Sequence, residues 1–126
     1  MYNILLVEDE REAAISIVRL LENHNYKVKT TDKAVEALSF LNEEEFDLVI
    51  VDLILPDMNG TELCALIRHD KRIQNIPIVI STGVGDAYTQ QENQGLGING
   101  FLKKPYTIDE LLLTIKNVLY NHNSEQ

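Results

Sequence analysis

Acids, hydroxyls and lysines follow four short apolar runs, and together they provide the groups that a phosphate or metal site requires. The polar groups are Glu8-Asp9-Glu10 after residues 4–7, Asp52 after 48–51, Ser81-Thr82 at the end of 78–81, and Lys103-Lys104 after 100–102. Asp52 is the most informative, because it ends an apolar run and is expected to be buried. An isolated buried carboxylate is costly unless it is paired or binds a metal.

Glu8 and Asp9 are expected beside Asp52 if the first and third apolar runs are neighbouring strands. Acids packed together repel one another and raise each other's pKa. A hard divalent cation relieves this repulsion, and Mg²⁺ prefers carboxylate oxygens and retained waters. Each acid taken alone is better explained as a strand-end residue that caps a helix. The combination of acids, hydroxyls and lysines at four strand ends favours a phosphate or metal site.

Strand-length apolar runs alternate with helical patterns along the chain. The expected strands are 4–7, 26–30, 48–51, 78–81 and 100–102, and helical patterns cover 10–23, 34–41, 60–67, 85–95 and 107–119. The run at 85–95 carries few apolar anchors, so any helix there would be weakly packed. Five strands alternating with five helices predict an α/β fold, a doubly wound parallel sheet with helices on both faces. Ligands of such sheets bind beyond the carboxyl ends of the strands.

Three helix starts have recognisable capping residues. Thr31 or Asp32 is a plausible cap of the second helix, and Asn59 of the third. Thr107 and Glu110 have capping-box spacing ahead of the last helix.

Composition narrows the class of protein further. The chain has 126 residues, a size typical of one domain, and a net charge of −9, which disfavours nucleic acid and anionic membranes as partners. The single cysteine, Cys64, excludes an internal disulfide. His24, His69 and His122 are too far apart to suggest a metal site. We find neither a membrane-spanning apolar run nor a signal peptide, so a cytoplasmic location is expected.

The complete set of motifs resembles the receiver domain of bacterial two-component response regulators. The resemblance covers essentially the whole chain, with 1–121 expected as the receiver domain and 122–126 as a polar tail. It rests on four segments in order: 6–10 (LVEDE), 51–60 (VDLILPDMNG), 81–83 (STG) and 100–105 (GFLKKP). The resemblance implies a flavodoxin-like five-stranded sheet in the order 2-1-3-4-5.

The resemblance also implies a role for individual residues. Asp52 is the expected phosphoryl acceptor. The expected Mg²⁺ site, which Mn²⁺ would also occupy, consists of Asp9 as a direct ligand, Glu8 acting through water, Asp52 and the backbone carbonyl of Ile54.

Residues of the last two strands complete the implied site. Thr82 is expected to bond a phosphoryl oxygen, and Lys104 matches the family lysine better than Lys103. The Lys104–Pro105 bond is expected to be cis, as it often is in the family. Phe101 has the position of the aromatic switch residue.

The function implied is that of a phosphorylation-dependent switch and not of an enzyme, although the domain would assist its own phosphoryl transfer and hydrolysis. The phosphoryl group would come from a histidine kinase or a histidine phosphotransfer protein. Phosphorylation would alter the surface around residues 82–105. Residues 85–95, the strand at Phe101 and the outer side of 107–119 would bind an output domain or a second receiver.

Two alternatives belong to other functional classes. A flavodoxin-like cofactor binder needs a hydroxyl- and glycine-rich loop after the first strand, but Glu8-Asp9-Glu10 would repel a phosphate. A receiver that no longer accepts phosphate is disfavoured, because no key position is missing.

Overall fold

The computed structural model describes residues 1–83 and 95–124. The described elements are β1 (Asn3–Val7), α1 (Arg11–Asn23), β2 (Lys27–Thr31), α2 (Ala34–Glu43), β3 (Leu48–Asp52), α3 (Gly60–His69), β4 (Ile78–Thr82), β5 (Gly100–Lys103) and α4 (Ile108–Ser124). The further helix expected within 85–95 falls almost entirely on residues outside these ranges. Helix α4 includes residues 122–124, the first part of the expected polar tail.

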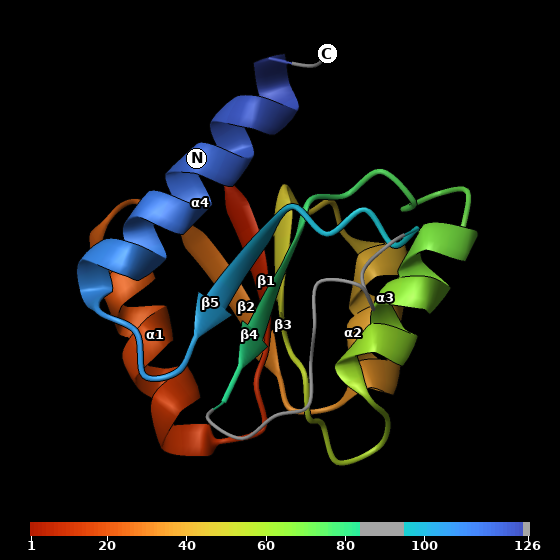
Figure 1. Ribbon diagram of the computed structural model, residues 1–126, viewed down its shortest axis with the longest axis horizontal. Coiled ribbons are helices and arrows are strands. Elements are labelled where there is room, and N and C mark those ends of the chain that lie inside the picture. The colour runs from red at the N-terminus through yellow and green to blue at the C-terminus, as the bar shows by residue number, and fades with distance from the viewer. Residues whose placement is uncertain (84–94, 125–126) are drawn as a thin grey trace.

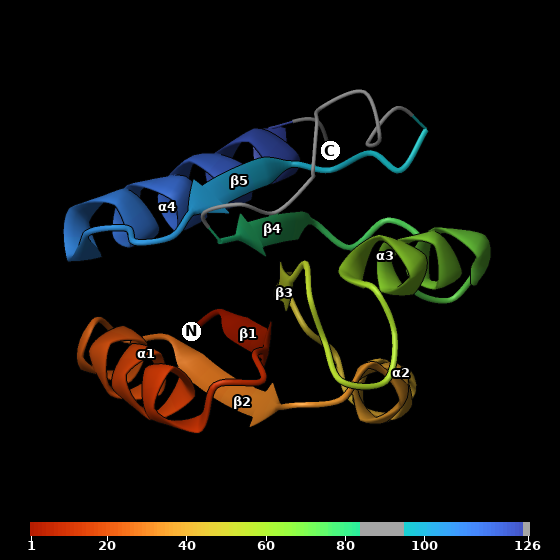
Figure 2. The same ribbon diagram turned by 60° about the horizontal axis from the view of Figure 1, so that its bottom comes forward.

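All five strands form one parallel sheet in the order β2-β1-β3-β4-β5, which confirms the predicted fold class. Figures 1 and 2 show α1 and α4 on one face of this sheet and α2 and α3 on the other. The carboxyl ends of the strands meet at the lower edge of Figure 1. This edge is where the polar groups after β1, β3, β4 and β5 come together.

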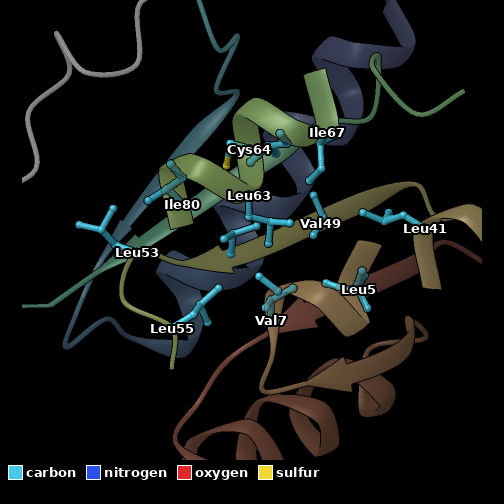
Figure 3. Packing of buried hydrophobic residues seen from close by; sticks show 14 residues of the cluster. Leu5, Val7, Leu41, Val49, Leu53, Leu55, Leu63, Cys64, Ile67 and Ile80 are labelled. Carbon is cyan, nitrogen blue, oxygen red and sulfur yellow. The ribbon is translucent and has the colours of Figure 1, made fainter. Parts of the chain in front are cut away.

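Side chains alternate between the two faces and build two hydrophobic clusters. Val49 (Figure 3) and Val51 pack with α2 and α3 in the first cluster, whereas Leu48 and Ile50 pack with α1 and α4 in the second. Cys64 of α3 is fully buried in the first cluster. Strands β1, β3 and β4 are buried on both faces because helices cover both, and this explains their unbroken apolar sequences.

Two of the expected helix caps are present. The side chain of Asn59 accepts a hydrogen bond from the amide of Thr61 (2.8 Å) at the start of α3. Thr107 and Glu110 form the reciprocal capping box ahead of α4, with distances of 3.1 and 3.2 Å.

The cap expected for α2 was wrong. The Thr31 hydroxyl accepts from Lys33, ahead of the helix, and not from the first amides of α2. The carboxylate of Asp57, from the loop after β3, accepts from Ala34 (2.9 Å) and Val35 (3.0 Å) instead. These backbone hydrogen bonds hold the pKa of Asp57 below its ordinary value. The loop after β3 and the start of α2 are therefore joined.

Arg68, in the last turn of α3, anchors the chain that leads into β5. Its guanidinium donates to the carbonyls of Leu96 (2.7 Å) and Gly97 (2.9 Å), and to the side chain of Asn99 (3.3 Å). Two further bonds join it to carbonyls of the α3–β4 loop, at 2.8 and 2.6 Å. The start of β5 is thus tied to α3 by neutral acceptors.

Among the described residues, no helix combines the length and the apolar character that crossing a membrane requires.

Candidate functional site

The site is centred on an ammonium group held between two buried acids. The Nζ atom of Lys104, directly after β5, lies 2.9 Å from Oε1 of Glu8 and 3.1 Å from Oδ2 of Asp52. Glu8 directly follows β1, and Asp52 ends β3, its neighbour in the sheet. The Lys104 side chain is 28% exposed and those of Glu8 and Asp52 only 2% and 8%, so both acids are shielded from bulk water.

Asp9 adds a third carboxylate, and it lies exposed at the mouth of the site. One carboxylate oxygen from each of Glu8, Asp9 and Asp52 can be chosen so that all three lie within 4.8 Å of one another. Three acids beside one ammonium leave an excess of negative charge. This excess is the feature that a bound cation would relieve.

Burial and the neighbouring Glu8 raise the pKa of Asp52 from 3.8 to about 7, although Lys104 opposes the rise. Burial also acts to raise the pKa of Glu8, but hydrogen bonds from Asp52, Lys104 and the amide of Glu10 outweigh it and lower that pKa. Burial lowers the pKa of Lys104, but Glu8 and Asp52 reverse this effect and raise it. The ammonium is therefore charged, and Asp52 is the acid of this pair that holds a proton most readily.

The donor set fits Mg²⁺ by its chemistry. All three groups are hard oxygen donors, and their charge exceeds that of the lysine. The oxygens of Glu8 are already engaged, Oε1 by Lys104 and Oε2 by the amide of Glu10 (3.2 Å). Asp9 has no side-chain hydrogen bond or ion pair to any described residue, so its oxygens are available to a metal.

A glycine at the start of α3 fixes the end of β3. A Cβ atom on Gly60 would lie 2.4 Å from the carbonyl oxygen of Asp52 and 2.9 Å from Cα of Leu53. Its amide donates to the carbonyl of Leu53 at 2.7 Å. Only a residue without a side chain permits this approach, so Gly60 sets the position of the backbone that carries Asp52.

The remaining predicted residues lie around this centre. Thr82 ends β4 and is partly buried, and its carbonyl accepts the amide of Lys104 at 2.6 Å. Ile54 lies in the loop directly beyond β3, and Phe101 on β5 is 38% exposed. The Lys104–Pro105 bond is cis, as the resemblance implied. Lys104, and not the exposed Lys103, contacts the two acids.

Sequence reasoning assigned no role to two residues near the site. Tyr106 follows Pro105, and burial, together with the charge of Glu8, raises its pKa. Ser81 precedes Thr82 and is 3% exposed, with a hydroxyl that bonds to no described residue. Ser81 and Thr82 are the two hydroxyl residues at the end of the apolar β4, but the sequence alone assigned Ser81 no role of its own.

Comparison with known proteins gives a consistent answer. The family model for the response regulator receiver domain matches residues 4–116. The response regulator ArlR of Staphylococcus aureus is 36% identical over 119 residues, which are 94% of this chain and 53% of the relative. The chain therefore spans about half the length of the curated relatives it matches.

Solved structures resemble the chain over nearly all or all of its length. A CheY-like receiver domain protein from Methanospirillum hungatei has a TM-score of 0.91 at 28% identity, covering 100% of this chain and 99% of that one. The chemotaxis response regulator CheY4 of Vibrio cholerae has a TM-score of 0.86 at 29% identity, covering 94% of this chain and 98% of that one.

Proposed function

The chain belongs to the response regulator receiver domain family of two-component systems, and on that premise we propose that Asp52 accepts a phosphoryl group from a phosphohistidine. The observation that carries this proposal is the placement of Asp52 at the end of β3, in contact with Lys104 and beside two further acids. The donor would be a histidine kinase or a histidine phosphotransfer protein. The reaction class is phosphoryl transfer to a carboxylate.

In this reaction a carboxylate oxygen of Asp52 forms a bond to phosphorus while the P–N bond of the phosphohistidine breaks. The electron pair of that bond remains on the imidazole nitrogen, which then takes up a proton. The transferring phosphoryl group carries negative charge on its oxygens, so catalysis consists mainly of positioning and charge neutralisation. Lys104 would supply one positive charge, and the hydroxyl of Thr82 would donate a hydrogen bond to a phosphoryl oxygen.

Mg²⁺, when bound, would neutralise charge on the phosphoryl oxygens and favour the ionised, nucleophilic form of Asp52. Asp9 would be a direct ligand, since its carboxylate has no other described partner. Glu8 would act through water, since Lys104 and the amide of Glu10 engage its oxygens. Asp52 and the backbone carbonyl of Ile54 would complete the protein's share of the ligands.

The chain would then act as a switch and not as an enzyme that turns over a separate substrate. Phosphorylation adds about −1.5 to −2 charges at Asp52, beside Thr82 and Lys104. We expect Thr82 and Phe101 to transmit the change to the surface around residues 82–105, for recognition by an output domain or a second receiver. Residues 84–94 of this segment lie outside the described ranges.

The test is phosphorylation by a small acyl-phosphate donor with Mg²⁺, followed by intact-mass spectrometry. We expect the mass of one phosphoryl group on the wild-type protein and none on Asp52→Asn. Asp57→Asn is the matched control, because Asp57 lies five residues further on but caps α2, and this variant should be labelled. Equal labelling of Asp52→Asn and wild type would refute the assignment of the acceptor.

A further inference from the structure

Ser81 is a buried hydroxyl whose hydrogen-bonding capacity is unused. Ser81 is 3% exposed. Among the fully buried side-chain oxygen and nitrogen atoms of the described residues, its Oγ is the one without a hydrogen-bond partner. Buried polar groups in proteins are normally hydrogen-bonded, and an unpartnered one costs free energy. An apolar residue would fill the same place at lower cost, so the hydroxyl requires an explanation.

Strand geometry places Ser81 next to the phosphoryl acceptor. Asp52 and Ser81 are direct partners in the register of β3 and β4, and neighbouring strands lie about 4.8 Å apart. Residues alternate between faces along a strand. Val79 packs on the α1 and α4 face, which puts Ser81 two residues later on that same face.

The same alternation applies to β3. Leu48 and Ile50 pack on the α1 and α4 face, and Val51 and Leu53 on the other, so Asp52 belongs to the face that Ser81 occupies. The two side chains are thus neighbours on one face of the sheet, at the site already described.

Without a phosphoryl group, Lys104 bonds one carboxyl oxygen of Asp52, and the Ser81 hydroxyl bonds neither. Its ammonium donates to Oδ2 of Asp52 at 3.1 Å and to Oε1 of Glu8 at 2.9 Å. Two charge-assisted bonds hold the lysine there, and such bonds are stronger than a hydrogen bond from a neutral hydroxyl. The lysine thus holds the Asp52 carboxylate in an orientation in which neither of its oxygens accepts a hydrogen bond from Ser81.

Phosphorylation changes this arrangement. Formation of the O–P bond divides the two carboxyl oxygens of Asp52 into one that carries phosphorus and one neutral carbonyl oxygen. The negative charge moves outward to the phosphoryl oxygens and attracts the Lys104 ammonium in that direction. The lysine then no longer fixes the orientation of the Asp52 carboxyl group. Its carbonyl oxygen has two lone pairs, so beside a bond to Mg²⁺ it can still accept a hydrogen bond on the face where Ser81 has a proton to donate.

We propose that Ser81 is a positioning residue of the phosphorylated state, whose hydroxyl donates a hydrogen bond to the carboxyl group of Asp52 once a phosphoryl group is attached. The proton stays on Ser81, and no covalent bond to it forms. The inference rests on the proposed function, since it requires Asp52 to be the acceptor. The Ser81 hydroxyl thus lowers the free energy of the phosphorylated state. In the unphosphorylated state it has no hydrogen-bond partner, which costs free energy.

The experiment measures the affinity of the phosphoryl mimic beryllofluoride, in the presence of Mg²⁺, by ¹⁹F NMR titration of the full chain. The unliganded melting temperature is measured beside it. Two matched pairs isolate the hydroxyl: Ser81 against Ser81→Ala, and Ser81→Thr against Ser81→Val, whose side chains have nearly the same shape. We expect Ser81→Ala to melt at or above the wild-type temperature yet to bind beryllofluoride about tenfold more weakly, the equivalent of one hydrogen bond.

Ser81→Thr should bind within about twofold of the wild type and Ser81→Val about tenfold more weakly. A purely structural role predicts another result: melting temperature and affinity fall together, or neither changes, and either outcome overturns the inference. If the Thr and Val variants do not fold, the Ser–Ala pair decides alone. Failure of the wild type to bind, or binding by Asp52→Asn equal to the wild type, overturns the proposed function as well. Equal binding by Ser81→Ala overturns the role of Ser81 alone.

Discussion

The two ends of β5 are each held by one cation, and the partners of these cations differ in kind. Ahead of the strand, Arg68 donates to four backbone carbonyls and one side-chain amide oxygen. Directly after it, Lys104 contacts the carboxylates of Glu8 and Asp52. The acceptors at the first end are neutral at every pH, whereas those at the second are carboxylates, whose charge changes on protonation and would change on the proposed phosphorylation.

The contacts of Arg68 therefore keep the same charge under all conditions, whereas the charge of the contacts of Lys104 can change. No charge in the partners of Arg68 can be removed, so that contact is independent of the state of the site. The partners of Lys104 would change charge on the proposed phosphorylation of Asp52. One end of β5 is therefore held by contacts of constant charge, and the other by contacts whose charge can change.

The largest effect is expected at the end held by Arg68. Arg68→Met should lower the free energy of unfolding by about 3 kcal/mol, because five acceptors lose their donor and the bonds to Leu96 and Ile76 are partly buried. Urea denaturation measures the loss. The matched control is Arg72→Met: Arg72 forms an exposed ion pair with Asp70, and its loss should cost less than about 0.5 kcal/mol. Equal losses in the two variants would show that Arg68 is no anchor.

At the other end, Lys104→Met should lower the free energy of unfolding by about 1–2 kcal/mol near pH 8. The loss should shrink toward about pH 5, because the two acids left without a cation take up protons there. Urea denaturation at both pH values gives the difference, with the exposed Lys103→Met as control. A loss that does not vary with pH would mean that Lys104 acts through packing and not through charge.

The smallest effect, with the opposite sign, is expected for Asp52→Asn in metal-free buffer. The pKa of Asp52 rises on folding from 3.8 to about 7. The stability associated with its protonated form is thus fully present below about pH 4 and lost as the pH rises to about 7. The amide of the Asn side chain does not ionise, so the variant keeps this stability as the pH rises. Its free energy of unfolding should match that of the wild type near pH 4 and exceed it by about 1 kcal/mol near pH 8.

Asp57→Asn is the control for this titration. Its pKa is lowered on folding by the amides of α2, so it contributes stability above the unfolded value and loses it as the pH falls. Replacing it should therefore destabilise the protein at neutral pH. A gain at neutral pH in both variants would show that general charge repulsion, and not the surroundings of Asp52, explains the effect.

The sequence was sufficient to predict the fold and the central contact of the site. Unbroken apolar runs identified the buried parallel strands, and the polar residues after them identified the edge at which Asp52, Glu8 and Lys104 meet. The capping residues of α3 and α4 were also predictable, because Asn59 and Thr107 lie directly at the helix starts that they cap. These are all local patterns, or consequences of one sheet topology.

Other contacts left no signal in the sequence. The acceptors of Arg68 are mostly backbone carbonyls, which every residue carries, so no pattern of residue types marks them. Asp57 caps a helix that begins 23 residues earlier, a contact that exists only once β3 and α2 are assembled. The role of Ser81 likewise depends on strand register, since only the pairing with Asp52 makes its hydroxyl notable.

Because Cys64 is buried, the reactivity of its thiol reports how often the folded chain opens. It is the single cysteine of the sequence, and burial raises the pKa of its thiol to about 12. Alkylating reagents attack thiolates, so the folded chain should resist them and the rate of modification should follow the population of opened molecules. A cysteine introduced on the exposed surface would then take a fluorescent or spin label selectively, with no need to remove the native one.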